Sequence, residues 1–281
     1  MTYHIGLTPA LTHEFDLQYI HVMQRIWNHP ENDQRPAVLE WLKPLQGIFT
    51  HILDIGPGDA YYLDHLKPKR YTVVEPNLTF RKMARERANN LKISAYEFSS
   101  VKSFLNRRTL HGYDLVMMIH VLFYMKLREI EMLLSKIVSK PLVVVYPSPE
   151  CSISTQFEAA IGLNCSRKRI NLMQELLGRP DTSKLITSHF RLPLDTPLES
   201  LAFLVAHHML DRKWDDDKID AAKSFVLQKE HLWRHPFGYQ IPQYQVLEYY
   251  NLADCWASQN LDFCSSNIAP ARSEYSDFKN L

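Results

Sequence analysis

Glycines and carboxylates gather where an apolar run gives way to a helix-like segment. In LDIGPGDA, Gly56 and Gly58 allow the backbone to turn sharply and approach a ligand, because a side chain would enter that space. Glu75 closes the next apolar run, TVVEP, 21 residues after Asp54, where a carboxylate can accept hydrogen bonds from both hydroxyls of a ribose. Alone, each feature is equally well a tight loop or a solvated strand end. Together they predict a site for a nucleotide-like ligand.

The acidic residues narrow the choice of ligand. A dinucleotide fingerprint needs GxGxxG, but position 61 is Tyr, and Asp54 and Asp59 would repel a pyrophosphate. S-adenosyl-L-methionine carries no phosphate, and its ammonium and sulfonium are attracted to acidic groups. We therefore predict this cofactor, bound by the two glycines, Asp54 and Glu75.

A histidine closes the apolar run VMMI. If that run is a strand of the same sheet, His120 leaves it at the edge where the glycine turn also lies. A neutral imidazole there could orient a substrate or accept its proton, so His120 is the predicted catalytic residue. The alternative is a histidine hydrogen-bonded at a strand end.

Other candidates carry weaker signals. Phe123 and Tyr124 could flank a sulfonium by cation–π contact or fill the core, and core filling suits Phe123 better. His207 and His208 are adjacent on a predicted helix, where neighbouring side chains point in different directions. They are not expected to share a metal ion, and no metal site is predicted.

The elements that must position these residues alternate along the chain. Two helices are predicted over residues 11–45, around the turn NHPEND. Short apolar runs then alternate with helical segments up to PLVVVYP, which predicts an α/β fold with a doubly wound, mostly parallel sheet. We expect helices over 153–163, 168–178, 197–211 and 216–232, with a strand at KLITSHFRL. A last strand, 239–250, contains Pro242, which favours an edge or a bulge.

This pattern divides the chain into four predicted parts. They are an N-terminal helical cap, a Rossmann-like cofactor-binding core, a mainly helical insert that ends in the last and antiparallel strand, and a tail of unassigned structure, at residues 1–45, 46–150, 151–250 and 251–281.

Composition excludes several functions. Lys plus Arg number 32 against 31 Asp plus Glu, so no global field attracts nucleic acid or an anionic membrane. The four cysteines show no CxxC spacing, which argues against a zinc ribbon. The first residues, MTYHIGLTPA, do not read as an export signal, and no apolar run is long enough to span a bilayer. A cytoplasmic protein is expected, and the sequence does not specify its oligomeric state.

The motifs LDIGPGDA, VVEPN and YDLVMMIHVLFYM, in this order, resemble those of class I S-adenosylmethionine-dependent methyltransferases. Within that superfamily the chain looks most like histamine N-methyltransferase-like small-molecule methyltransferases, through MIHVLFYM and WNHPEND. The resemblance extends over about residues 11–250 and implies a Rossmann-like methyltransferase sheet with one antiparallel strand.

The resemblance also implies site residues. For the cofactor it suggests Gly56, Glu75, a serine after the third strand (Ser99 or Ser100), and Ile119 after the fourth. For the acceptor it suggests the following positions: Glu31 or Asn32 in the N-terminal turn, Tyr19 and Met23 on the first helix, and Gln240 on the last strand. His120 stands where those relatives have a glutamine, which argues against histamine itself.

The expected function is therefore methyl transfer to a small molecule, with an amine as the expected acceptor and N-methylation as the reaction. Three alternatives stay open: O-methylation of a metabolite, methylation of a protein or nucleic acid, and cofactor binding without catalysis. The segment IHVLFY lacks the Asn/Asp-Pro-Pro-Tyr type of motif used on extruded bases, which lowers the case for DNA.

Overall fold

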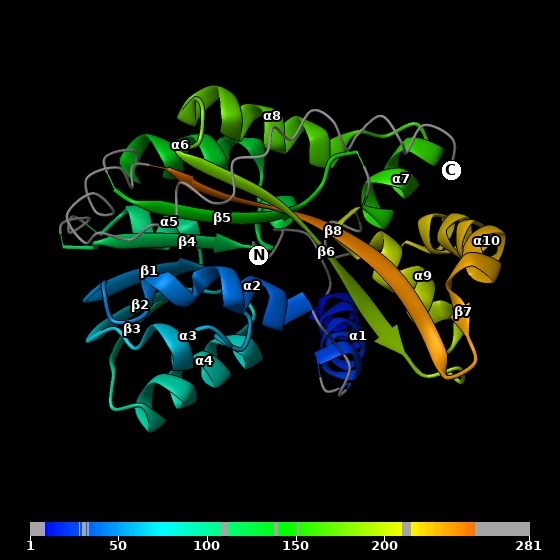
Figure 1. Cartoon of the computed structure of the whole chain (residues 1–281), viewed down its shortest axis with the longest axis horizontal. Coiled ribbons are helices and arrows are strands. Elements are labelled where there is room, and N and C mark those ends of the chain that lie inside the picture. Colours follow the sequence, from blue (N-terminus) through cyan, green and yellow to red (C-terminus); the bar gives the residue numbers. More distant parts are fainter. Residues whose placement is uncertain are drawn as a thin grey trace.

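The computed structural model describes residues 9–27, 29, 32, 34–107, 112–137, 140–150, 152–209 and 215–250. Figure 1 shows a twisted sheet with helices on both faces and a group of helices at one end. The expected tail, 251–281, lies outside the described residues.

One eight-stranded sheet organises the fold. Its order is β3-β2-β1-β4-β5-β8-β6, with the short β7 paired to β8. The pairs among β1 to β5 are parallel, and β8 runs antiparallel to both β5 and β6. The predicted α/β class, with a mostly parallel sheet and one antiparallel strand in its path, is confirmed. The strands are β1 (His51–Ile55), β2 (Arg70–Val74), β3 (Ser94–Phe98), β4 (Leu115–Ile119), β5 (Leu142–Pro147), β6 (Thr182–Leu192), β7 (Arg234–His235) and β8 (Gly238–Tyr250).

The central strands are buried along their whole length because helices cover both of their faces. HILDI, LVMMI and LVVVY, in β1, β4 and β5, are buried at every position. The edge strand β3, SAYEF, is exposed at alternate positions instead. Short apolar runs in the sequence therefore marked the inner strands correctly.

Two helical layers sandwich the sheet (Figure 1). One apolar cluster joins α2, η1, α3 and α4 to one face, and a second joins α5, α6 and α8 to the other. These elements are α2 (Gln34–Leu42), η1 (Lys43–Leu45), α3 (Leu63–Leu66), α4 (Leu78–Asn90), α5 (Val101–Leu105), α6 (Leu127–Ile137) and α8 (Cys165–Leu177).

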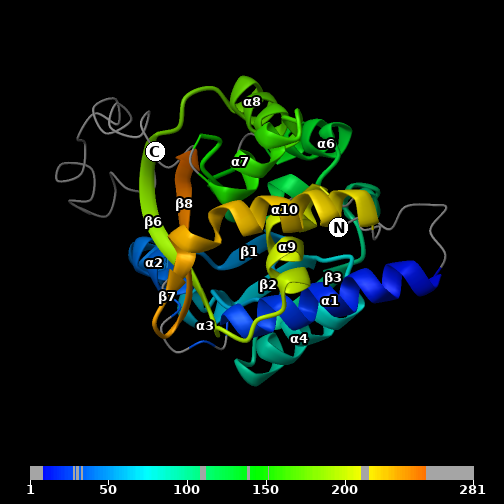
Figure 2. The ribbon, with the colours of Figure 1, turned by 90° about the vertical axis from the view of Figure 1, so that its right-hand side faces the viewer.

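A third apolar cluster forms a cap at the carboxyl ends of the parallel strands. It combines α1 with α7, α9 and α10 and with the far halves of β6 and β8. Figure 2 shows α1, α9 and α10 together at this end of the molecule. The remaining helical elements are α1 (Pro9–Trp27), η2 (Leu122–Tyr124), α7 (Ile153–Ala160), α9 (Leu198–Ala206), η3 (His207–Met209) and α10 (Asp216–Trp233).

The packing divides the N-terminal segment differently from the predicted boundary at residue 45. Helix α1 contributes Phe15, Val22 and Ile26 to the cap cluster, whereas α2 contributes Val38 and Trp41 to the sheet core. The insert also supplies β6, an eleven-residue strand of the main sheet. The cap is thus built from both ends of the described chain.

Other elements differ from the expected bounds. The helix expected to reach about Leu110 ends at Leu105, and residues 108–110 lie outside the described part of the chain. Strand β8 lies between β5 and β6, but the pairing with β5 begins only at Gln245. Pro242 therefore faces a strand, β6, on one side only, which is how a residue without an amide proton fits into an interior strand.

In the described residues, no helix combines the length and the apolar character that a membrane crossing requires.

The cap core gives a stability prediction. Ile26 is fully buried between α1 and the rest of the cap. Ile26→Ala should lower the free energy of unfolding by about 2–5 kcal/mol, because it removes buried methyl groups and leaves a cavity. Leu227→Ala, on α10, is the control, since Leu227 is 56% exposed and its change should stay within about 0.5 kcal/mol. Urea unfolding of both variants tests this, and equal losses would show that α1 is not anchored in the cap.

Candidate functional site

The glycine turn after β1 is fixed by backbone geometry. Gly56 has φ +66° and its amide donates to the carbonyl of Val74 at 2.8 Å. A Cβ at this position would overlap the side chain of Val121, so no other residue fits without a shift. Gly58 also has a positive φ, +59°, but the space around it is open, with Trp27 nearest at 3.8 Å. The second glycine therefore leaves room beside the backbone.

Two buried carboxylates meet beside this turn. Asp54 accepts a hydrogen bond from the hydroxyl of Tyr71 at 2.7 Å, and Glu75 accepts one from the Asn77 amide at 2.8 Å. The Gly58 amide also points at Glu75, at 3.4 Å. Burial raises the pKa of Asp54 to about 7, helped by the charge of Glu75 and opposed by the bond from Tyr71. A cation beside these acids would favour their ionised forms.

The turn is poorly suited to a phosphate. Residues 59–62 form turns, and the short helix α3 begins only at Leu63, so no helix N-terminus follows directly on the glycines. The carboxylates of Asp54 and Glu75 would also repel a phosphate, and the amide of Gly58 is already directed at Glu75. The structure therefore agrees with the sequence argument against a dinucleotide.

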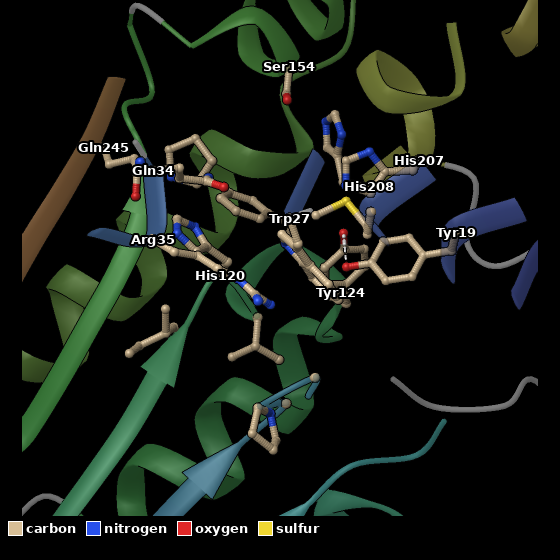
Figure 3. Close-up of a pocket in the computed structure, with 18 of the residues that line it drawn as sticks. Tyr19, Trp27, Gln34, Arg35, His120, Tyr124, Ser154, His207, His208 and Gln245 are labelled. Atoms are coloured by element: carbon tan, nitrogen blue, oxygen red, sulfur yellow. Dashed lines mark hydrogen bonds between the residues drawn. The ribbon is translucent and has the colours of Figure 1, made fainter. Parts of the chain in front are cut away.

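A pocket extends from the glycine turn into the cap (Figure 3). Nine of the residues predicted for the site line it: Tyr19, Met23, Asp54, Gly56, Gly58, Glu75, Ile119, His120 and Tyr124. The N-terminal helices and the insert both supply lining residues. The structure thus brings the predicted cofactor and acceptor positions into one continuous space.

Five predicted residues do not line this pocket. Asn32 closes the turn after α1, donating to the carbonyl of Ile26 at 2.7 Å and accepting from the amide of Gln34 at 3.0 Å. Ser100 caps α5 through Ser103 and borders a smaller cavity that also touches Val74 and Val121.

The other three lie elsewhere. Ser99 is exposed, and Gln240 pairs with Arg191 of β6. Glu31 lies outside the described residues.

His120 is held in a rare backbone conformation. Its φ is +55°, uncommon for a residue with a side chain, and its amide donates to the carbonyl of Val145 at 2.8 Å. Burial lowers the pKa of its imidazole to about 4, against a hydrogen bond with Gln245 that raises it. The charge of Arg35 lowers it further. His120 is therefore neutral near pH 7 and a weak base.

Aromatic rings line the part of the pocket under the cap. The hydroxyls of Tyr124 and Tyr19 lie 3.4 Å apart, marked by the dashed line in Figure 3. The ring of His207 lies 5.6 Å from that of Tyr19 and 5.8 Å from that of Tyr124. Phe80 contacts Tyr19 edge-on at 5.8 Å. Such a wall favours an apolar or weakly cationic group.

Sequence patterns missed several lining residues. Arg35, expected only as part of a helix, lies over the Trp27 ring at 3.8 Å and holds Asp59 with bonds of 2.7 and 3.0 Å. Gln243 and Gln245, not Gln240, face the pocket from β8. The two-residue period of a strand was the available signal, because it puts 243 and 245 on one face and 240 on the other.

His207 and His208 also line the pocket. The sequence suggests only metal binding as a role for these two histidines, and their adjacent positions on a helix argue against it. Nothing in the pattern predicts that they line the pocket. In the described residues, no group of three or more side chains of the metal-binding kinds is close enough to hold an ion.

Comparison with known proteins gives structural likeness alone. No family model and no curated protein sequence matches the chain. It is similar to a proposed methyltransferase of Bacillus halodurans C-125, with 12% identity, TM-score 0.49, and 76% of this chain and 96% of that one covered. For the N-methyltransferase NodS of Bradyrhizobium japonicum, the values are 14%, 0.45, 83% and 97%. For an S-adenosylmethionine-dependent methyltransferase of Archaeoglobus fulgidus, they are 17%, 0.44, 82% and 99%. All three TM-scores are below 0.5, so the functional assignment rests on the chain's own residues.

The raised pKa of Asp54 predicts a pH-dependent stability. Because the folded-state pKa lies above the ordinary 3.8, the contribution of Asp54 is fully present below that value and is lost as pH rises through about 7. Each pH unit between the unfolded and folded pKa values of a group changes the free energy of unfolding by roughly 1.4 kcal/mol. Wild type should therefore lose stability between pH 5 and pH 8, whereas Asp54→Asn should not. The free energy of unfolding of Asp54→Asn minus that of wild type should thus be larger at pH 8 than at pH 5.

Urea unfolding at the two pH values measures this effect. Asp217→Asn, at an exposed position at the start of α10, should show little change in its difference from wild type. An Asp54→Asn difference that is the same at pH 5 and pH 8 would contradict a raised pKa.

Proposed function

We propose that the chain is an S-adenosylmethionine-dependent methyltransferase that acts on a small molecule, with an amine as the favoured acceptor. One observation carries the proposal: the glycine turn, Asp54 and Glu75 open directly into a pocket walled by aromatic rings. The acids suit the cofactor's ammonium and ribose, and the rings suit the group that receives the methyl.

The residues present fit this cofactor. Glu75 lies at the end of β2 and lines the pocket, where its carboxylate can accept hydrogen bonds from ribose hydroxyls. The open side of Gly58 admits the ligand against the backbone, and the buried Asp54 attracts its cationic amino-acid end. When bound, the cofactor supplies a methyl group activated by the sulfonium. The protein's part is to align the acceptor and exclude water.

The acceptor side favours a small, largely neutral molecule. Tyr19, Met23 and Tyr124 enclose it together with η3 of the cap. Such an enclosure disfavours a charged ammonium through desolvation, so an amine would bind in the neutral form that can attack. A hydroxyl acceptor fits the same space, and O-methylation stays the nearest alternative.

Cofactor binding is tested with a matched pair of glycine variants. Gly58→Leu should weaken binding of S-adenosylhomocysteine by roughly tenfold or more, which is about 1.4 kcal/mol, because its side chain occupies the ligand's space. Gly162→Leu carries a comparable backbone strain, with φ +74° and nothing within 4 Å of its Cβ, but lies away from the pocket. Calorimetry compares both with wild type. Equal affinity of Gly58→Leu and wild type would remove the role of the glycine turn.

Turnover separates an enzyme from a non-catalytic binding protein. Release of S-adenosylhomocysteine should be measured against a panel of small amines, hydroxyl compounds, a peptide and an oligonucleotide. Release with a small amine is the expected result, and binding of the cofactor without release from any member would favour the non-catalytic alternative.

The pKa of His120 predicts how its variants behave. Because the imidazole is neutral above about pH 4, it acts as a hydrogen-bonding group throughout the range in which the enzyme would work. His120→Gln should stay within roughly tenfold of wild-type kcat/KM with an unchanged pH profile from 6 to 9, since it loses at most the difference between two hydrogen bonds. His120→Ala should lose more. A loss of roughly 100-fold or more in His120→Gln would show instead that His120 is a base.

A further inference from the structure

A buried carboxylate and histidine in the cap form a pair that the proposed cofactor site does not use. Nε2 of His208 lies 2.9 Å from Oε1 of Glu158, and both side chains are 2% exposed. Ser166 adds two bonds to Glu158, from its amide at 2.9 Å and from its hydroxyl at 2.5 Å. Three hydrogen bonds therefore hold the Glu158 carboxylate in place.

The bonding pattern determines which nitrogen of His208 carries the proton. Burial by itself raises the pKa of Glu158, but the bonds from His208 and Ser166 outweigh it and hold that pKa below its ordinary value. Glu158 is therefore a carboxylate, and its Oε1 accepts a hydrogen bond from Nε2–H of His208. In the neutral ring this leaves the lone pair on Nδ1.

Nδ1 of His208 has no protein partner among the described residues, a feature that it shares with Nε2 of His120 in the same pocket. It is buried and makes no hydrogen bond within the described part of the chain, while its ring lines the pocket beside Phe123 and His207. Figure 3 shows His207 and His208 together at the cap side of the pocket, and the ring of His207 packs against those of Tyr19 and Tyr124. Buried polar atoms in native proteins nearly always have a partner, so an unpaired acceptor on a ring that lines a pocket indicates a donor on the ligand.

We propose that Nδ1 of His208, oriented by Glu158, accepts a hydrogen bond from the methyl acceptor. The acceptor must then carry an N–H or O–H at the atom that is methylated or next to it. This inference deepens the proposed function and rests on it for the identity of the reaction.

The same geometry assigns the proton in the transfer step. The acceptor's nitrogen or oxygen forms a bond to the methyl carbon as the carbon–sulfur bond breaks, and that electron pair stays on sulfur. The acceptor's proton passes to Nδ1 of His208. The resulting imidazolium lies against the Glu158 carboxylate, which stabilises its charge. His208 thus differs from His120 in its partner, which is a carboxylate, whereas the partner of His120 is the neutral amide of Gln245.

Phenol and toluene test the hydrogen bond directly. The two have nearly the same shape, but only phenol has an O–H to donate. Wild type, with and without saturating S-adenosylhomocysteine, should bind phenol about tenfold more tightly than toluene. Equal affinities, or no phenol binding, overturn the proposal. Failure of S-adenosylhomocysteine to bind instead refutes the proposed function, and the comparison without it still tests His208.

Two variants assign the preference to the pair. His208→Phe keeps a ring of similar size but offers no acceptor atom, so the preference for phenol should disappear. Glu158→Gln should reduce it. His231→Gln, at an exposed position on α10, should leave it unchanged. Thermal unfolding shows whether each variant is folded, and a folded His208→Phe that retains the preference overturns the proposal.

Wild-type nuclear magnetic resonance provides a readout independent of any variant. For the neutral ring, histidine ¹⁵N shifts should show the proton of His208 on Nε2 and none on Nδ1, with the Nδ1 signal moving when phenol but not toluene is added. A proton resident on Nδ1 of a neutral ring, or an Nδ1 signal that phenol does not move, overturns the proposal.

Discussion

The contact between Gly56 and Val121 fixes the geometry of the whole site. The two loops that leave β1 and β4 diverge here, and they pass so close that Val121 fills the place of a side chain on residue 56. Both loops use left-handed backbone to turn, at Gly56 and at His120. Because neighbouring parallel strands end at the same edge of the sheet, Asp54, Glu75 and His120 lie together beside this contact.

Burial then gives the site residues their chemical character. Asp54, Glu75 and His120 sit in the same pocket, yet burial pushes the pKa of Asp54 up and that of His120 down, because it disfavours the charged form of each. The pocket is therefore less charged than its residue types suggest. It is prepared for a ligand that brings its own positive charge, and for an acceptor that arrives neutral.

The sequence predicted the sheet and the cofactor end of the pocket because both depend on local signals. The runs HILDI, LVMMI and LVVVYP identified the inner strands, and the spacing of Asp54, Gly56, Gly58 and Glu75 identified their common edge. The cap could not be predicted in the same way. His208 meets Glu158 fifty residues away in the chain, a pairing with no periodic signature. Gln240 and Gln243 differ only in which face of β8 they occupy, so an error of one residue in strand register exchanges pocket and surface.

The position of β8 has a consequence for synthesis on the ribosome. This strand, residues 238–250, lies between β5 and β6, so β5 keeps an unpaired edge and β6 has no neighbour in the sheet until residue 250 has been made. The four parallel pairs among the first five strands can form earlier, because each joins strands that have already been made. For the time needed to translate about a hundred further residues, the nascent chain exposes an apolar strand edge of the kind that invites aggregation. Because β8 also supplies Gln243 and Gln245 to the pocket, the sheet and the pocket are completed in the same late step of folding.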